Sequence, residues 1–337
     1  MGKNMDKVEL IICTERGYLE SMARLLIYSL REFGGEFKDI PVYSYQPRKK
    51  YKISKETVSF FDKHNVEYVD LNLNTEFDFY PLANKPLTCA HRERNTHAKI
   101  LIFLDTDTFI LREPCDFNNF NGADVILRPV DTKNIGKDKF HDHNVFYWDK
   151  LYSLLDVRIC RTVTSTVDKK EILEYYNSGQ IVSQTDNDLF TAWEDNFIKT
   201  MRSGLRPHKR LFYLEQSVFA ATVAQLELEV QLADENYNFP VHLFDSITGE
   251  DCRVSEHNFV TVHYHNLFQN RDGRNPIAHI LDNSENGRNI NQKVEEFGLI
   301  RRVSPARRIG IKLKNNMRKV LQELAWQRYT QGNRFNR

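Results

Sequence analysis

The sequence predicts an α/β protein with a doubly wound mixed sheet flanked by helices. Short apolar segments alternate with helical ones from the start of the chain, at 8–14, 40–45 and 66–71. Strands that alternate with helices at this spacing form parallel sheets, because each helix carries the chain back across the sheet. A run of five apolar residues, Ile100–Leu104, is typical of a strand buried on both faces.

Helices are expected between these strands. Segment 18–33 has apolar residues at helical spacing and stops at two glycines, Gly34 and Gly35. Segment 54–64 begins at a serine, a favoured helix N-cap, and segment 81–94 leads into the central strand. Further helices are expected at 145–155, 187–201 and from 214 onward, and further strands at 123–128, after 179 and at 258–266.

The composition bounds the class of protein. The chain has 337 residues, and 41% hydrophobic with 12% aromatic content is ample for a core, in one large domain or two smaller ones. Five scattered cysteines without CxxC spacing indicate neither a disulfide framework nor a zinc site and fit a reducing compartment. The N-terminus lacks a signal-peptide core, and no apolar run approaches membrane-spanning length. We expect a cytoplasmic protein.

Basic residues gather at the C-terminal end. Residues 301–337 carry 11 Lys and Arg and one acid, Glu323, which leaves 36 basic and 45 acidic residues, a net charge of −9, elsewhere. An amphipathic helix is predicted over 306–329, with Trp326 and Tyr329 at its end. This helix either lies on the inner face of an anionic membrane or docks on the acidic body. Nucleic-acid binding is not expected, because the basic residues are confined to one tail.

Two aspartates follow the central apolar strand. Asp105 and Asp107 point the same way in an extended chain, since side chains alternate. Open α/β sheets bind ligands at this end of their strands, and two carboxylates there can hold a divalent cation that binds a diphosphate. The alternative is an aspartate pair that caps a turn. A second Asp-x-Asp, Asp186 with Asp188, follows a polar segment and is more simply a helix cap.

Histidines supply further candidate metal ligands. His263 and His265 share one face of the strand at 258–266, where a neutral imidazole could bind the same ion. Otherwise both histidines need hydrogen-bond partners in the core. His141 and His143 lie in a polar segment, 132–145, that is better explained as a loop over the cleft than as a metal site.

Several other residues have a structural and a functional interpretation. Asn177, Ser178 and Gly179 are expected to form a tight turn, either an ordinary one or one that lets backbone approach a ligand. Glu215 suits the first turn of a helix, and Lys85 is most simply a solvated lysine. No GxGxxG or GxxxxGK[ST] follows the first strand, which argues against dinucleotide-binding dehydrogenases and P-loop NTPases.

Five short motifs occur in order between residues 8 and 270: Thr14 with Tyr18, Leu104–Thr108 (Leu-Asp-x-Asp-Thr), Asn177–Gly179, Glu215–Gln216 and His263–Tyr264. Together they resemble the metal-dependent nucleotide-sugar glycosyltransferases of the glycosyltransferase-A fold. Within that fold the chain is similar to the glycogenin-like and bacterial lipopolysaccharide galactosyltransferase-like group, family 8. This sequence departs from the group's pattern at Glu215, where aspartate is usual. Asn266 and Gln269 stand where a glycine and a lysine are usual, and Arg271 or Arg274 could replace that lysine.

The resemblance implies a metal and a donor. It implies Mn²⁺, with Mg²⁺ as an alternative, bound by Asp105, Asp107 and His263, and a UDP-sugar as donor. A divalent cation stabilises the charge that develops on a departing nucleoside diphosphate, and oxygen ligands with an imidazole suit Mn²⁺ better than Ca²⁺. The resemblance also implies donor-binding residues, namely Thr14 and Tyr18 at the base together with Lys85, Thr106 and Gly179, and catalytic residues, namely Asn177, Glu215 and Gln216.

The sequence therefore predicts a glycosyltransferase, and the resemblance implies that it retains the anomeric configuration. Its catalytic domain is expected over residues 1–275, followed by a C-terminal extension over 276–337 that carries the basic helix. The acceptor is a glycan, a lipid-linked molecule or a protein. Two alternatives remain open, a catalytically silent scaffold of the same fold and a nucleotidyltransferase. The latter normally has a Gly-rich phosphate loop, for which 15–17 is a poor match.

Overall fold

The central element is a mixed sheet. The computed structural model describes residues 7–138, 143–208, 210–244, 258–265, 267–269, 277, 281–282, 284–300 and 305–335. Within these ranges, seven strands form one sheet in the order β10-β6-β9-β4-β1-β2-β3. They are β1 (Val8–Cys13), β2 (Val42–Tyr45), β3 (Val66–Val69), β4 (Ile100–Leu104), β6 (Val125–Pro129), β9 (Tyr176–Gln184) and β10 (Val230–Leu232). Strand β9 runs antiparallel to β4 and β6, and the other pairs are parallel.

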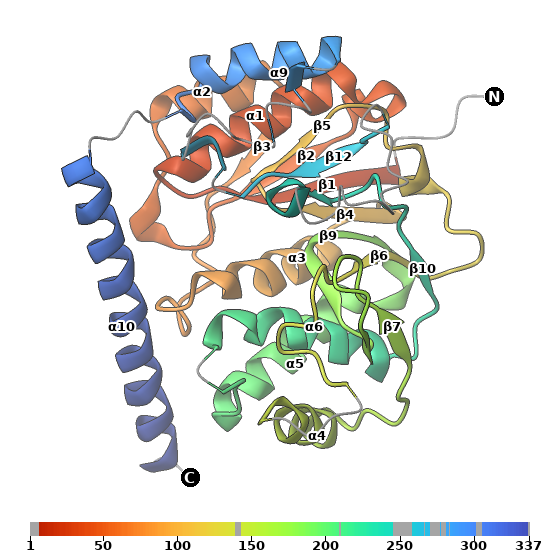
Figure 1. The fold of residues 1–337 in the computed structure, drawn as a ribbon, viewed down its shortest axis with the longest axis vertical. Helices are drawn as coiled ribbons and strands as arrows, with labels where there is room; N and C mark the ends of the chain where they lie inside the picture. The colour runs from red at the N-terminus through yellow and green to blue at the C-terminus, as the bar shows by residue number, and fades with distance from the viewer. Residues whose placement is uncertain are drawn as a thin grey trace.

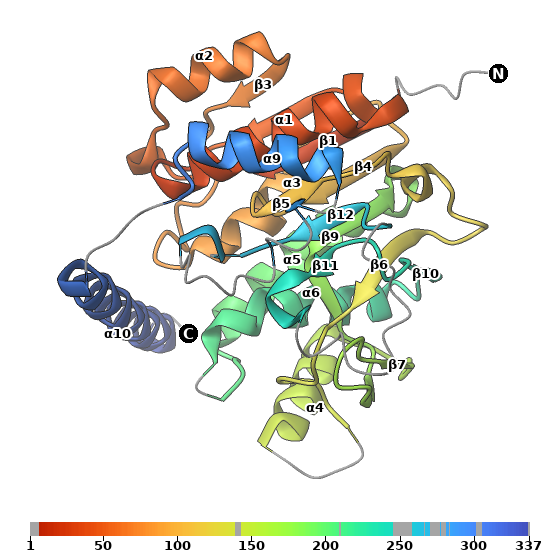
Figure 2. The same ribbon diagram turned by 45° about the horizontal axis from the view of Figure 1, so that its top comes forward.

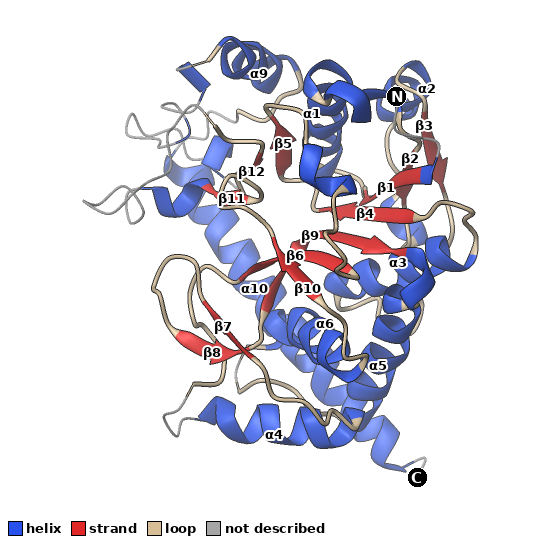
Figure 3. Ribbon diagram, turned by 90° about the vertical axis from the view of Figure 1, so that its right-hand side faces the viewer, coloured by secondary structure: helices blue, strands red, loops and turns tan. Residues whose placement is uncertain are grey.

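Helices cover both faces of this sheet, as Figures 1 and 3 show. Helices α1 (Tyr18–Phe33), α2 (Lys55–Lys63) and α9 (Glu285–Glu296) lie on one side. Helices α3 (Asn84–Arg94), α4 (His143–Leu155), α5 (Leu189–Ser203) and α6 (Leu214–Gln225) lie on the other. The predicted doubly wound mixed sheet flanked by helices is confirmed.

Strand β4 shows why the sheet needs two helical layers. Leu101 and Phe103 pack into the apolar cluster that includes α3, α5 and α6, and Ile102 and Leu104 into the cluster that includes α1 and α2. All four are at most 1% exposed. Since the side chains of a strand alternate between faces, a continuous apolar run buries both. Each such burial stabilises the fold by about 1.5–3 kcal/mol.

A second sheet closes over the end of β4. It contains β11 (Phe239–Pro240), β12 (Thr261–His263) and β5 (Thr108–Ile110), with β12 antiparallel to β5. Figure 2 shows this small sheet between α9 and the central sheet. His263 pairs with Thr108, so β12 runs beside the residues that follow β4.

The remaining elements are short or peripheral. Strands β7 (Thr162–Thr164) and β8 (Glu171–Leu173) form a small antiparallel pair. Short 3-10 helices cover Gly35–Asp39, Lys49–Tyr51, Pro81–Ala83, Cys115–Asn118, Thr185–Asn187, Leu211–Tyr213, Val241–Leu243 and Leu267–Gln269. No helix in the described part of the chain combines the length and the apolarity needed to cross a bilayer.

Helix α10 (Pro305–Phe335) stands to one side of the body (Figures 1 and 2). Its later part docks: Trp326 is buried, the Tyr329 ring lies 5.8 Å from that of Phe77, and Glu323 pairs with Arg206 at 2.5 Å. The amphipathic helix expected over 306–329 is therefore a helix, and its end packs on the domain. The proposed domain boundary at residue 275 lies outside the described residues.

One predicted turn is wrong. Asn177, Ser178 and Gly179 do not form a turn but belong to β9, which continues to Gln184. Small polar residues are typical of turns, but here cross-strand pairing with β4 holds them extended. Their small size instead permits a close approach to neighbouring side chains, described below.

Helix α5 begins differently from the cap that the sequence indicates. Asp188 sits at the N-cap with φ 54°, but its side chain makes no capping bond. The carboxylate of Glu93, on α3, instead accepts hydrogen bonds from the backbone amides of Phe190 (3.1 Å) and Thr191 (2.7 Å). A residue about a hundred positions away thus satisfies the free N–H groups of the helix start.

We predict that Glu93→Ala lowers the free energy of unfolding by about 1–2 kcal/mol, because two buried N–H groups lose their acceptor. Asp186→Ala is the matched control: Asp186 is exposed at the same helix start, and its loss should change stability by less than about 0.5 kcal/mol. Urea unfolding followed by circular dichroism measures both. Equal stabilities of the two variants would contradict the assigned cap.

Candidate metal centre

Lys85 and Asp105 form an ion pair where β4 ends, in which the lysine is buried and the aspartate partly exposed. The Lys85 Nζ lies 2.8 Å from Asp105 Oδ2, and the backbone amide of Asp105 donates to the carbonyl of Gly179 at 2.7 Å. Burial opposes the charged form of Lys85, but the Asp105 carboxylate raises the pKa of the ammonium above its usual value. The interpretation of Lys85 as a solvated surface lysine is therefore wrong.

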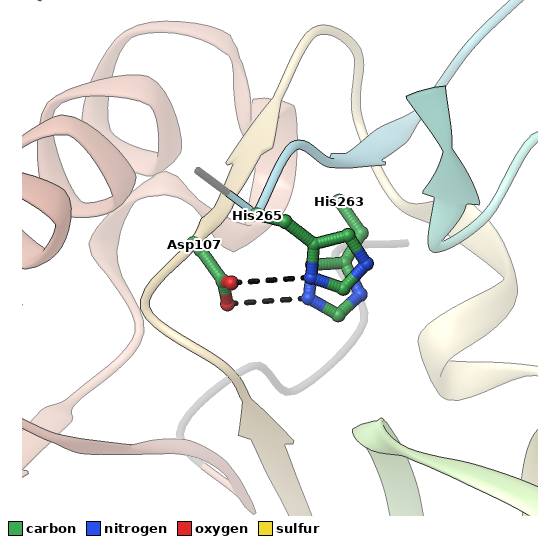
Figure 4. A group of neighbouring side chains, drawn as sticks. All are labelled: Asp107, His263 and His265. Carbon is green, nitrogen blue, oxygen red and sulfur yellow. Dashed lines mark ion pairs between the residues drawn. The ribbon is translucent and has the colours of Figure 1, made fainter. Parts of the chain in front are cut away.

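Asp107 faces two histidines, as Figure 4 shows. Its Oδ1 lies 3.2 Å from His263 Nε2, and its Oδ2 lies 3.5 Å from His265 Nδ1. The backbone amide of Tyr264 also donates to the carbonyl of Asp107 at 2.9 Å, which fixes the two chain segments together. One carboxylate and two imidazoles thus converge from two chain segments that are far apart in sequence, the link between β4 and β5 and the end of β12.

The electrostatics of this group favour a bound cation. Burial disfavours the charged form of Asp107, but the facing His263 and His265 hold the pKa of its carboxyl well below the usual value. Burial likewise opposes protonation of His263, while the Asp107 carboxylate raises the pKa of its imidazole. The neighbouring imidazoles stabilise the carboxylate through hydrogen bonds and charge. A divalent cation can supply that positive charge instead.

The donor set fits the metal that the resemblance implies. Ligand atoms of Asp107, His263 and His265 all lie within 4.8 Å of one another. Carboxylate oxygen with imidazole nitrogen is a donor set that Mn²⁺ and later first-row metals accept. Of the three ligands expected from the sequence, Asp107 and His263 face each other, whereas Asp105 is paired with Lys85.

His242, which the sequence analysis did not single out, lies beside this group. Its ring meets the ring of His265 edge-on, with centroids 4.2 Å apart. Burial and the nearby His265 lower the pKa of His242 to about 4, so its imidazole is neutral at pH 7. His242 lies in the short helix Val241–Leu243, which has no periodic pattern that would connect it to β12.

Gly179 lies against both carboxylate and imidazole groups. A Cβ atom at this position would lie 2.9 Å from Asp105 Oδ2 and 3.1 Å from His263 Cε1. The backbone amide of Gly179 donates to Asn177 Oδ1 at 2.7 Å. A small residue is therefore required at 179 because neighbouring side chains crowd this position of β9, and not because the chain turns here.

Glu215 approaches the same group from the first turn of α6. It is buried, and burial raises the pKa of its carboxyl to about 7, an effect that Lys85 opposes. Ser178 hydrogen-bonds this carboxyl group, while Glu215 Oε1 is buried without a partner among the described residues. An acidic side chain with a free buried oxygen is unusual in a purely structural role.

The remaining predicted residues lie at the edges of this group. Thr14 is fully buried at the end of β1, where its hydroxyl accepts from Ser44 Oγ at 2.8 Å. The Tyr18 hydroxyl, on α1, donates to the carbonyl of Leu299 at 3.1 Å. Thr106 is buried between the two aspartates, and Gln216 is half-buried beside Glu215. Contacts of these residues with a donor stay predictions.

Some sequence-based candidates cannot be placed. Asn266, Arg271, Arg274 and His141 lie outside the described residues, and for His143 and Gln269 only the backbone is described, at the start of α4 and the end of a short helix.

Comparison with known proteins adds a family. Residues 10–227 match the model of a family described as the Rhodobacterales glycosyltransferase domain. The match includes Lys85, Asp105, Asp107 and Glu215 but ends before His263. No curated protein matches the chain.

Among solved structures, the chain is similar to galactosyltransferase LgtC in complex with donor and acceptor sugar analogs. The two are 12% identical, over 89% of this chain and 99% of that one, with a TM-score of 0.48. It is also similar to the bifunctional glycosyltransferase WbbM, with 12% identity over 86% of this chain and 52% of that one and a TM-score of 0.46. Mouse xyloside xylosyltransferase 1 is 11% identical over 77% of this chain and 97% of that one, with a TM-score of 0.44.

We predict that Glu215 makes stability fall as pH rises from about 4.5 to 7. The folded chain keeps the Glu215 proton up to about pH 7, whereas the unfolded chain releases it near pH 4.5. The folded state therefore binds more protons in this window, and ionisation at higher pH costs up to about 3 kcal/mol. The free energy of unfolding, measured with urea at pH 5 and pH 8, should fall less between these pH values in Glu215→Gln than in the parent chain.

The control for this titration is Glu36→Gln, which changes an exposed glutamate far from the site. It should keep the pH dependence of the parent chain. An identical pH dependence in Glu215→Gln and the parent chain would rule out an elevated pKa at Glu215.

Proposed function

Because the chain belongs to the Rhodobacterales glycosyltransferase domain family, we propose that it is a glycosyltransferase that uses a UDP-sugar as donor and Mn²⁺ as metal. The observation that carries the proposal is the convergence of Asp107, His263 and His265 beside the Lys85–Asp105 pair. Withdrawing these ionisable groups from water together costs free energy, which a bound charged ligand would offset.

Each group has a part in the proposal. When bound, the metal would stabilise negative charge on the departing UDP. Asp107 and His263 would hold the ion, and Asp105 would orient Lys85 toward the donor phosphates. Lys85 is suited to this role, since its pKa keeps it charged at any physiological pH. Asp105 thus acts through Lys85 in this arrangement.

The sugar-side residues in the proposal are Asn177, Gly179, Glu215 and Gln216. The strand β9 brings the first two, and the start of α6 brings the others, to the group around Lys85. The free oxygen of Glu215 can accept a hydrogen bond from a sugar hydroxyl, and Gln216 can place an amide dipole near the reacting carbon. Retention of configuration is part of the proposal, which the anomeric form of the product would test.

We also propose that α10 places the enzyme on an anionic membrane, where a lipid-linked glycan acceptor is presented. The helix has an exposed apolar stripe, Leu313, Met317, Val320, Leu321 and Leu324. These positions recur every three or four residues and so share one face. Lys314, Arg318 and Lys319 lie exposed among them. Exposed apolar residues flanked by lysine and arginine suit the surface of an anionic bilayer.

We predict that UDP binding requires both Mn²⁺ and Asp107. Calorimetric titration of UDP into the protein should give binding with Mn²⁺, none with EDTA, and a loss of about tenfold or more in Asp107→Asn. His97→Ala, which changes an exposed histidine on the loop after α3, should bind like the parent chain. UDP binding that is unchanged by EDTA would contradict metal dependence. If UDP does not bind and another nucleotide does, the donor sugar is carried by that other nucleotide.

We predict that the protein floats with vesicles of phosphatidylcholine and phosphatidylglycerol, and less so at high salt. The triple variant Leu313→Ser, Met317→Ser and Leu321→Ser should stay at the bottom of the gradient, because it removes most of the stripe. Phe212→Ser removes an equally exposed apolar side chain elsewhere and should float like the parent chain. Substitution is preferable to deleting 301–337, since Trp326 belongs to the core.

Flotation of the triple variant at the level of the parent chain would refute the membrane proposal. If the parent chain stays unbound and sediments as a dimer that the triple variant lacks, the stripe instead contacts a second copy of the chain.

A further inference from the structure

We infer that His265 is a metal ligand in this chain, so that the ion is bound by Asp107, His263 and His265 while Asp105 stays outside its coordination shell. The inference rests on the metal dependence proposed above. It changes the chemistry of the site from two carboxylates and one imidazole to one carboxylate and two imidazoles. Such a site selects Mn²⁺ and later transition metals over Mg²⁺, which prefers oxygen ligands and retains water.

The first argument is geometric. Each Asp107 oxygen faces a different imidazole, at 3.2 Å for His263 and 3.5 Å for His265, and the ligand atoms lie within 4.8 Å of one another (Figure 4). Metal bonds of about 2.0–2.2 Å place two ligands of one ion roughly 3–4 Å apart. A small movement of the side chains is therefore enough to enclose an ion.

The second argument is the backbone at His265. Strand β12 ends at His263, and His265 adopts φ 49°, a left-handed conformation that is uncommon outside glycine. This bend brings its ring over the ring of His263, with centroids 4.0 Å apart. Between them, Tyr264 is fully buried and stacks on Phe109, which directs the two flanking histidines to the same side as Asp107. Strain held in this way is typical of functional positions.

The third argument concerns Asp105. Its Oδ2 lies 2.8 Å from the buried Lys85 Nζ, which also lies 3.5 Å from Ser178 Oγ. If Oδ2 turned to an ion, this ammonium would lose its nearest partner, and an unpaired buried charge is strongly destabilising. We therefore assign Asp105 to the ion pair with Lys85 and His265 as the third metal ligand.

The experiment uses Mn²⁺ alone as the probe, with the full chain and no nucleotide. Titration followed by electron paramagnetic resonance measures free Mn²⁺, and pulsed measurements of the bound ion count the coordinated imidazole nitrogens. The parent chain should show two nitrogens. His265→Ala should show one and bind Mn²⁺ about tenfold or more weakly, whereas Asp105→Asn and the control His97→Ala should change the affinity less than about threefold.

One coordinated nitrogen in the parent chain would overturn the inference, and this result needs no variant that has to fold. Unchanged affinity in His265→Ala, or a loss in Asp105→Asn as large as in His265→Ala, would also overturn it while leaving metal-dependent transfer intact. If the parent chain binds no Mn²⁺ either alone or with UDP, both this inference and the proposed metal dependence fail.

Discussion

The pairing of β9 with β4 is the constraint on which the site depends. The amide of Asp105 donates to the carbonyl of Gly179, so the end of one strand is fixed against the start of the other. This register puts Gly179 close to Asp105 and His263, and it brings Ser178 to Lys85. Because β9 is antiparallel within an otherwise parallel sheet, its first residues, and not its last, reach the ligand-binding edge.

Charge is concentrated at this edge at a cost to stability. Asp105, Asp107 and Glu215 are gathered beside one lysine and two histidines, and each is withdrawn from water to some degree. Removing such groups from water costs several kcal/mol per ion unless their partners are well placed. Burial raises the pKa of Glu215 more than Lys85 lowers it, whereas at Asp107 the two facing imidazoles outweigh burial and lower the pKa.

Helix α10 divides into a docked and an exposed part, and the two have different roles. Trp326 and Tyr329 anchor the helix to the domain, while the side chains of the apolar stripe ahead of them are largely exposed. Both alternatives that the sequence offered, docking on the body and contact with a surface, are therefore compatible in one helix. The anchored end would hold the enzyme at a fixed orientation relative to whatever the stripe contacts.

The sequence by itself determined the sheet, its helices and the position of Asp105 and Asp107 at a strand end. These features follow from local pattern, since apolar periodicity and strand ends are properties of neighbouring residues. Tertiary structure alone decided that Lys85 is buried, that 177–179 is strand, that Glu93 caps α5, and that His242 joins His265. Each of these features depends on a contact with a residue that is distant in the sequence and that the fold brings near. No local sequence pattern encodes such a contact.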